Sequence, residues 1–183
     1  MTEFNELLER NREFAANADL GGLAMPPKEA MPDKLLLLLT CVDPRVEPAG
    51  FLGVGTWDAG VLRNAGGRVD DKVVEDIAYL SMRLGARMDV AVIHHTQCGT
   101  GMLSEPAFRQ AFADRTGLDE GALTERAVTD PTTTVRQDVA KLLANPLLSS
   151  DIIASVSGHV LRLETGLVET VVEATAPART PAA

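Results

Sequence analysis

The sequence predicts an α/β domain with a mostly parallel central β-sheet flanked by helices. Two aliphatic runs, Leu35 to Thr40 and Val90 to Ile93, have the length and the lack of alternation that are typical of buried parallel strands. Between them lie a short apolar segment at residues 59–63 and a helical pattern at residues 71–84. The order strand, strand, helix, strand favours crossover connections within one parallel sheet.

The size and composition of the chain fit one domain. Its 183 residues, of which 45% are apolar, suffice for a single hydrophobic core. We expect residues 1–33 to form a helical arm and a linker, residues 34–175 to form the core, and residues 176–183 to be a frayed tail.

The charge of the chain restricts its partners. The formal net charge of −9 disfavours nucleic acid and anionic membranes, because both repel an acidic protein that lacks a basic patch. The first ten residues lack the basic and apolar regions of a secretory signal, and no aliphatic run is long enough to span a bilayer. We therefore expect a cytoplasmic protein that binds neither nucleic acid nor membrane.

The arm begins with apolar residues at helical spacing, which predict an amphipathic helix over residues 3–16. These residues are Phe4, Leu7, Leu8 and Phe14. A Gly-Gly pair and a Pro-Pro pair then predict an irregular linker up to Lys34.

The helix at residues 71–84 has capping signals at both ends. Asp70 and Asp71 complement its amino terminus, and Gly85 lies where a left-handed residue is needed. Residues 47–56, which are rich in Gly and Pro, predict a loop.

Further helices are predicted at residues 105–113 and 132–143, the second of which begins at Asp130-Pro131. The polar residues 114–130 between them predict an irregular segment.

The carboxyl-terminal part predicts β-structure. We expect a strand at residues 152–156 and then a hairpin with strands at residues 160–163 and 167–172.

Both cysteines of the chain lie at the ends of predicted strands. Cys41 follows the first aliphatic run, and His95 and Cys98 follow the second. The carboxyl ends of parallel strands share one edge of the sheet, where open α/β folds place their ligands. Two sulfurs and one imidazole suit zinc and leave a fourth tetrahedral position open. His94 should point away, because side chains alternate along a strand.

Asp43 and Arg45 extend the first motif. In an extended backbone they project to the same side as Cys41, and Pro44 favours that conformation for Asp43. A thiolate, a carboxylate and a guanidinium would then line one wall of the site.

Three motifs together resemble the β-class carbonic anhydrases. They are Cys41-Val-Asp43-Pro-Arg45, His95-Thr-Gln-Cys98 and Arg63-Asn-Ala-Gly66-Gly67. The resemblance implies that fold and a zinc ion held by Cys41, His95 and Cys98. It also implies reversible hydration of CO2 to bicarbonate by zinc-bound hydroxide, because zinc lowers the pKa of its bound water to about 7.

The resemblance also implies roles for the other residues. Asp43 and Arg45 would be the catalytic pair, in which a bidentate ion pair keeps the carboxylate off the metal. In an inactive form, Asp43 could instead ligate the zinc. Arg63, Gly66 and Gly67 would contact substrate, although a salt bridge that locks the loop is an alternative role for Arg63. The family further implies a homodimer or a dimer of dimers, with the amino-terminal helix at the interface.

Departures from the family pattern affect the expected rate and substrate more than metal binding. Gln97 stands where an acidic residue is common, and Gly99-Thr-Gly101 lengthens the following turn. We expect Arg68 to be solvated and His159 to be structural or exposed.

Three alternatives remain on the sequence alone. A hydrolase of carbonyl sulfide or carbon disulfide would use the same ligands. A non-catalytic zinc-binding interaction protein would normally fill the fourth position with Cys or His. A redox pair of Cys41 and Cys98 would leave His95, Asp43 and Arg45 without a purpose.

Overall fold

The computed structural model describes residues 3–178, and the chain divides into two compact units between Ala30 and Met31. The first unit begins with α1, Phe4–Asn17, which confirms the predicted amphipathic helix, and no residue of α1 is buried. Two 3₁₀ turns, Leu20–Leu23 and Lys28–Ala30, follow it.

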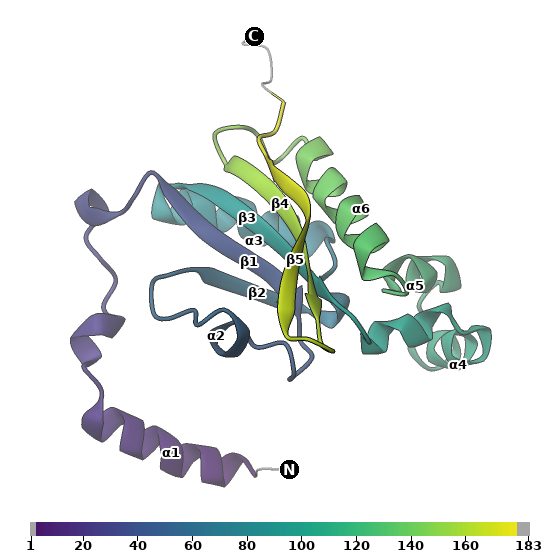
Figure 1. The fold of residues 1–183 in the computed structure, drawn as a ribbon, viewed down its shortest axis with the longest axis horizontal. Helices are drawn as coiled ribbons and strands as arrows, with labels where there is room; N and C mark the ends of the chain where they lie inside the picture. The colour runs from purple at the N-terminus through teal and green to yellow at the C-terminus, as the bar shows by residue number, and fades with distance from the viewer. Residues whose placement is uncertain (1–2, 179–183) are drawn as a thin grey trace. The chain divides into compact units, whose positions relative to one another are not determined.

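The second unit is built on a five-stranded sheet (Figure 1). Its strands are β1 Lys34–Cys41, β2 Gly60–Asn64, β3 Arg87–His95, β4 Ile153–Arg162 and β5 Leu167–Thr175. Their order is β2-β1-β3-β4-β5, in which the first four strands are parallel and β5 is antiparallel to β4. The predicted α/β architecture with a carboxyl-terminal hairpin is confirmed.

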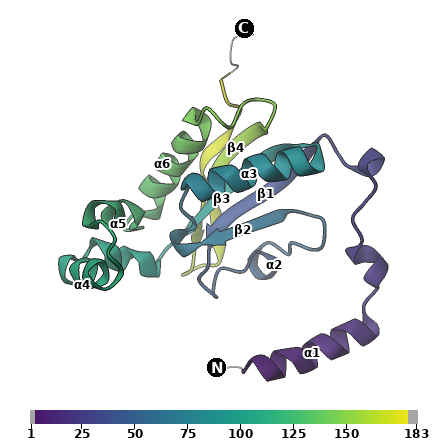
Figure 2. The ribbon, with the colours of Figure 1, turned by 180° about the vertical axis from the view of Figure 1, so that it is seen from behind.

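The helices of this unit cover the two faces of the sheet unequally. They are α2 Pro48–Phe51, α3 Asp71–Leu84, α4 Pro106–Thr116, α5 Glu120–Arg126 and α6 Pro131–Ala144. Apolar side chains of α3 and α6 pack with residues of β1, β3 and β4 in the main core, and Figure 2 shows α3 lying across that face. The opposite face carries a smaller core, which includes Val46 and Phe51.

The capping residues predicted for the helices are in place. Asp70 accepts a hydrogen bond from Val73 N at 2.9 Å, and Gly85 ends α3 with a φ of 65°. Asp130 accepts from the backbone N–H groups of Thr132 and Thr133 at the start of α6. Local sequence therefore sets both ends of α3 and the start of α6, the two helices that pack on the sheet in the main core.

Three predictions of local structure are wrong. Residues 48–51, expected to lie in a loop, form the short helix α2. Residues 120–126, expected to be irregular, form α5, which Asp119 caps by accepting from Ala122 N and which buries Leu123. This helix is too short to show a repeating apolar pattern.

The predicted break between strands 152–156 and 160–163 is also absent, because β4 is continuous from Ile153 to Arg162. Gly158 is not a turn residue here. A Cβ at this position would lie 3.0 Å from a methyl of Val139 and 3.2 Å from a methyl of Val135, so the glycine allows close packing of α6 on the strand.

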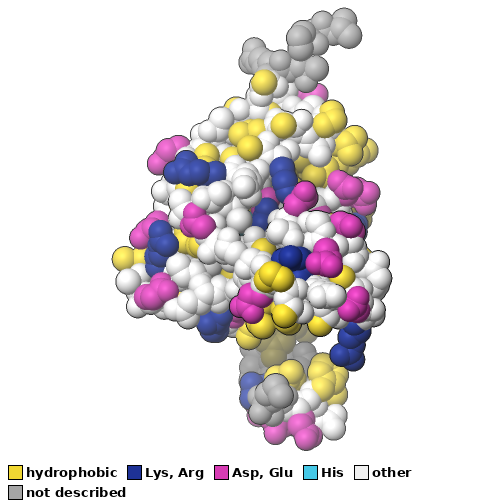
Figure 3. Space-filling view, turned by 90° about the vertical axis from the view of Figure 1, so that its right-hand side faces the viewer, with side chains coloured by type: hydrophobic (Ala, Val, Ile, Leu, Met, Phe, Trp, Pro, Cys, Tyr) yellow, Lys and Arg dark blue, Asp and Glu magenta, His cyan; other side chains and the backbone are white. Residues whose placement is uncertain are grey.

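Among the described residues, no helix is both long and apolar enough to cross a bilayer. On the face drawn in Figure 3, basic and acidic side chains are interspersed and do not form a basic patch.

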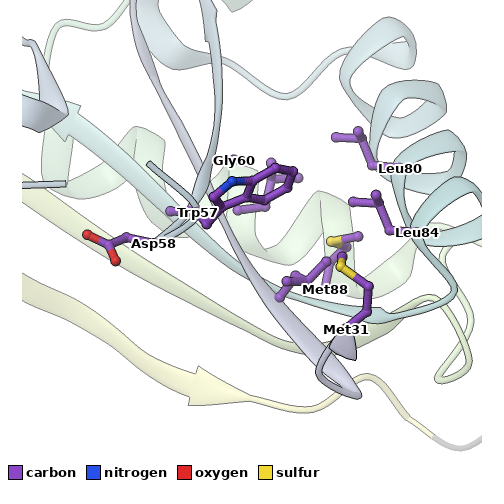
Figure 4. A pocket seen from close by; sticks show the side chains of 10 residues that line it. Met31, Trp57, Asp58, Gly60, Leu80, Leu84 and Met88 are labelled. Carbon is purple, nitrogen blue, oxygen red and sulfur yellow. The ribbon is translucent and has the colours of Figure 1, made fainter. Parts of the chain in front are cut away.

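An apolar cavity of about 170 Å³ lies beside the beginnings of β1, β2 and β3 (Figure 4). Its lining includes Met31, Leu35, Trp57, Gly60, Leu84 and Met88. The carboxylate of Asp58 points away from the labelled apolar side chains. The cavity is thus at the opposite edge of the sheet from Cys41 and His95, which end their strands.

Candidate metal centre

The two predicted ligand motifs converge at the carboxyl edge of the sheet. Cys41 is the last residue of β1 and His95 the last of β3, and these strands are parallel neighbours with Thr40 paired to Ile93. One ligand atom from each of Cys41, His95 and Cys98 lies within 4.8 Å of the others. The sulfurs of Cys41 and Cys98 are 4.0 Å apart.

The geometry of this cluster fits a tetrahedral metal ion. With Zn–S bonds of about 2.3 Å, a tetrahedral angle places two sulfurs about 3.8 Å apart, close to the separation found. His95 Nδ1 donates to Thr96 O at 2.8 Å, which leaves the lone pair on Nε2. Nε2 is buried and has no hydrogen-bond partner within residues 3–178, so a metal ligand is the role that its environment supports.

The sulfurs of the cluster are surrounded by hydrogen-bond donors. Asp43 N and Gly66 N lie 3.4 and 3.3 Å from Cys41 Sγ, and Thr100 Oγ1 lies 3.1 Å from Cys98 Sγ. A hydrogen bond from Cys41 lowers the pKa of Cys98 to about 6, and the same bond raises the pKa of Cys41 to about 11. A cation that binds both sulfurs must displace the remaining proton, so its affinity should rise with pH.

Asp43 and Arg45 form the bidentate pair that the sequence predicted. Arg45 Nε lies 2.9 Å from Asp43 Oδ1, and its second terminal nitrogen lies 2.6 Å from Oδ2. This hydrogen bonding to Arg45 lowers the pKa of Asp43 to about 2. Arg45 also donates to Gln97 O at 3.0 Å, which ties the pair to the segment between His95 and Cys98.

Arg63 holds the loop that follows Cys41. It donates to Cys41 O at 3.0 Å and to Asp43 O at 2.9 Å, and it forms an ion pair with Glu47. These contacts agree with the alternative role of Arg63, in which a salt bridge locks the loop. The predicted contact of Arg63 with substrate remains a proposal.

Gly66 and Gly67 lie against the end of β1. Both have positive φ, at 89° and 66°. A Cβ on Gly67 would lie 2.9 Å from the carbonyl carbon of Thr40, so this position requires glycine for its conformation and for close backbone contact.

Arg68 is not solvated as predicted but buried in an ion pair. Its guanidinium donates to both carboxylate oxygens of Asp138 on α6, at 2.7 and 3.2 Å. His94, which points away from the cluster as predicted, lies 3.2 Å from the same carboxylate and from Gly67 O. Burial raises the pKa of Asp138, but hydrogen bonds from His94 and Arg68 outweigh burial and lower it overall.

The sequence analysis missed Asp138. A signal was present, because Asp138 lies on the apolar stripe of α6 between Val135, Val139 and Leu142, all of which are buried. A carboxylate on such a stripe needs a buried partner, and Arg68 supplies it.

His159 is half-buried and structural, as expected. Its ring nitrogens lie 2.9 Å from Ser157 Oγ and 3.2 Å from Thr170 Oγ1. Desolvation lowers its pKa.

The turn after Cys98 is a 3₁₀ segment, Gly99–Ser104, which positions Thr100 beside the sulfur.

The fold and the cluster define a class: α/β proteins with a mostly parallel sheet that carries, at its carboxyl edge, two cysteines and a histidine able to hold a metal ion. Known proteins narrow this class. The model of the carbonic anhydrase family matches residues 36–168. The chain belongs to the β-class carbonic anhydrase family, which confirms the resemblance and, at the level of the family, the expectation of a carbonate dehydratase.

Three individual relatives illustrate the match. β-Carbonic anhydrase 1 of Mycobacterium tuberculosis is 30% identical over 166 residues, which are 91% of this chain and 96% of the relative. The crystal structure of a carbonic anhydrase from Streptococcus mutans has a TM-score of 0.74 and 33% identity, covering 93% of this chain and 98% of that one. A carbon disulfide hydrolase of Saccharolobus solfataricus is 34% identical over 83 residues, 45% of this chain and 40% of the relative.

Proposed function

We propose that this protein is a zinc enzyme that reversibly hydrates CO2 to bicarbonate and a proton. The observation that carries the proposal is the cluster of Cys41, His95 and Cys98, which lies beside a carboxylate held by an arginine. In the part of the chain that the structure describes, the buried Nε2 of His95 has no hydrogen-bond partner. The relatives in Mycobacterium and Streptococcus that bear the carbonic anhydrase name support the choice of substrate.

The proposed zinc would be held by the two sulfurs and by His95 Nε2. When bound, it supplies a Lewis acid that lowers the pKa of water and so provides a nucleophile near neutral pH. Asp43 is ionised throughout the neutral range, since its pKa is about 2, and can accept a hydrogen bond from the attacking water. Arg45 fixes the direction of both carboxylate oxygens.

The loop of residues 63–67 is the proposed substrate wall. Gly66 and Gly67 lie beside Cys41, and Arg63 has more N–H groups than its three partners use in single bonds. We therefore assign contacts with CO2 or bicarbonate to Arg63, Gly66 and Gly67.

A homodimer or a dimer of dimers in the cytoplasm is part of the proposal. The apolar residues of α1 support it, because Phe4 is 72% and Phe14 51% exposed. Analytical ultracentrifugation of the full chain measures the assembly directly, and a monomer at micromolar concentration would contradict it.

Hydrolysis of carbon disulfide or carbonyl sulfide is the second candidate. It is favoured by the similarity over 83 residues to a carbon disulfide hydrolase. The same cluster would serve both reactions, so the substrate has to be established by measurement.

The test combines metal analysis with two activity assays. We expect about one zinc per chain and stopped-flow hydration of CO2 that depends on it. Sulfide release from carbonyl sulfide and carbon disulfide is measured on the same sample. Zinc without hydration between pH 6 and 9, together with sulfide release, would contradict the proposal and favour the second candidate.

Replacing Arg45 separates metal binding from catalysis. In Arg45→Ala, the Asp43 carboxylate loses its bidentate partner while all three ligands remain. Because misplacing a catalytic group by about 1 Å can cost about 100-fold, we expect kcat/KM to fall by about that factor. Zinc content should stay near that of the wild type.

Arg83→Ala, on α3, serves as the control for loss of an arginine. Hydration by Arg45→Ala at the rate of this control would show that the ion pair does not contribute to catalysis.

A further inference from the structure

Glu164, in the turn between β4 and β5, contacts the segment that links two of the candidate ligands. Its Oε2 accepts from Thr96 Oγ1 at 2.9 Å, and its Oε1 accepts from Gln97 Nε2 at 2.9 Å. Thr96 and Gln97 are the first two residues after His95, and Cys98 follows them directly. One carboxylate therefore holds both residues that connect His95 to Cys98.

Backbone groups of the hairpin formed by β4 and β5 also make hydrogen bonds to this segment. Leu163 N donates to Thr96 Oγ1 at 2.9 Å, and Thr96 N donates to Leu161 O at 3.1 Å. Thr96 is thus fixed to the end of β4 by three hydrogen bonds, counting the one to Glu164. These hydrogen bonds hold the turn that carries Glu164 in place, although the side chain of Glu164 is exposed.

Gln97 has a backbone conformation that needs such support. Its φ is 56°, in the left-handed region that is unfavourable for a residue other than glycine. The same conformation presents Gln97 O to Arg45, which donates to it at 3.0 Å. A continuous set of hydrogen bonds therefore runs from Glu164 through Gln97 to Arg45 and on to Asp43.

We infer that Glu164 is a positioning residue for this site: through the side chains of Thr96 and Gln97 it holds the strained segment that aims Cys98 at the metal and Gln97 O at Arg45. The inference depends on one part of the proposed function, the binding of a metal ion, and not on the reaction that the protein catalyses. Glu164 acts as a pair of hydrogen-bond acceptors, and its effect on the metal is transmitted through the chain.

The experiment measures zinc release to a colorimetric chelator from the full-length protein. Glu164→Ala removes both acceptors, and we expect release about tenfold faster, since residues that orient metal ligands contribute about 10–100-fold in affinity. Glu164→Gln keeps an oxygen for Gln97, and its amide group can donate to the Thr96 hydroxyl, so release should stay near the wild-type rate.

Exchanging the amide of Gln97 with the carboxylate of Glu164 tests whether slow zinc release can be restored. Gln97→Glu alone places two carboxylates opposite each other, which should speed zinc release at least as much as Glu164→Ala. Combining Gln97→Glu with Glu164→Gln restores a carboxylate–amide pair and should slow release again. In the cobalt-substituted proteins, the sulfur-to-cobalt absorption should change in both fast-releasing variants and return in the double variant.

Glu169→Ala is the matched control, because Glu169 lies in the same hairpin but pairs with Arg162. Release from Glu164→Ala that equals release from this control would overturn the inference, and so would failure of the double variant to recover. A wild-type chain that takes up neither zinc nor cobalt would instead overturn the proposed function and the inference with it.

Discussion

Cys41→Ser is expected to abolish zinc binding and CO2 hydration while the fold persists. Cys41 supplies one of three ligand atoms, and it is buried at the end of β1 with Asp43 N and Gly66 N directed at its sulfur. A serine hydroxyl fits the same space and can accept the same two hydrogen bonds, so the loop should stay in place. A neutral hydroxyl does not replace a thiolate as a zinc ligand.

The expected loss of zinc affinity exceeds about 100-fold, because even the partners that orient ligands contribute about 10–100-fold. Zinc content after dialysis and stopped-flow hydration check this result, and circular dichroism checks the fold. Ser81→Ala, a buried change on α3 towards the other edge of the sheet, is the control. Full zinc content in Cys41→Ser would contradict the assignment of this ligand.

Asp138→Ala is expected to destabilise the fold by about 3–5 kcal/mol, the usual cost of breaking a buried ion pair. The side chains of Asp138 and Arg68 are 0% and 7% exposed, and His94 shares the carboxylate. Without Asp138, the charge of Arg68 stays buried, and among the described residues only the backbone carbonyl of Ala127 remains as an acceptor for its guanidinium. Urea unfolding, followed by circular dichroism, measures the change in the free energy of unfolding.

Two further variants separate loss of the pair from loss of a carboxylate. Asp76→Ala removes an exposed carboxylate of α3 that pairs with Lys72, and it should change stability little. Replacing both partners, in Arg68→Met with Asp138→Leu, removes the unpaired charge and should recover much of the stability. If Asp138→Ala unfolds at the same urea concentration as Asp76→Ala, the ion pair does not stabilise the fold.

Much of the fold follows from local sequence signals. The aliphatic runs predicted β1 and β3, and the residues Asp70, Gly85 and Asp130 predicted the helix ends that the structure contains. Metal-ligand convergence was also predictable, because it requires only that two parallel strands end at one edge. These features depend on residues close together in sequence or on a general rule of sheet topology.

Features that depend on specific tertiary contacts were not predicted. Arg68 was expected in solvent because its partner, Asp138, is 70 residues away. Glu164 likewise is 68 residues from Thr96, and no local pattern marks it as a neighbour of the metal cluster. The continuity of β4 was not predicted either: Gly158 allows α6 to approach this strand, and a glycine of that kind has the same appearance in sequence as one in a turn.

The central claim is that one zinc ion is bound by two sulfurs and one imidazole nitrogen of this chain. X-ray absorption at the zinc edge tests it most directly on the purified wild-type protein. We predict two sulfur neighbours at about 2.3 Å and at least one nitrogen at about 2.0–2.1 Å. A spectrum with four sulfur neighbours, or with nitrogen and oxygen neighbours alone, would contradict the account.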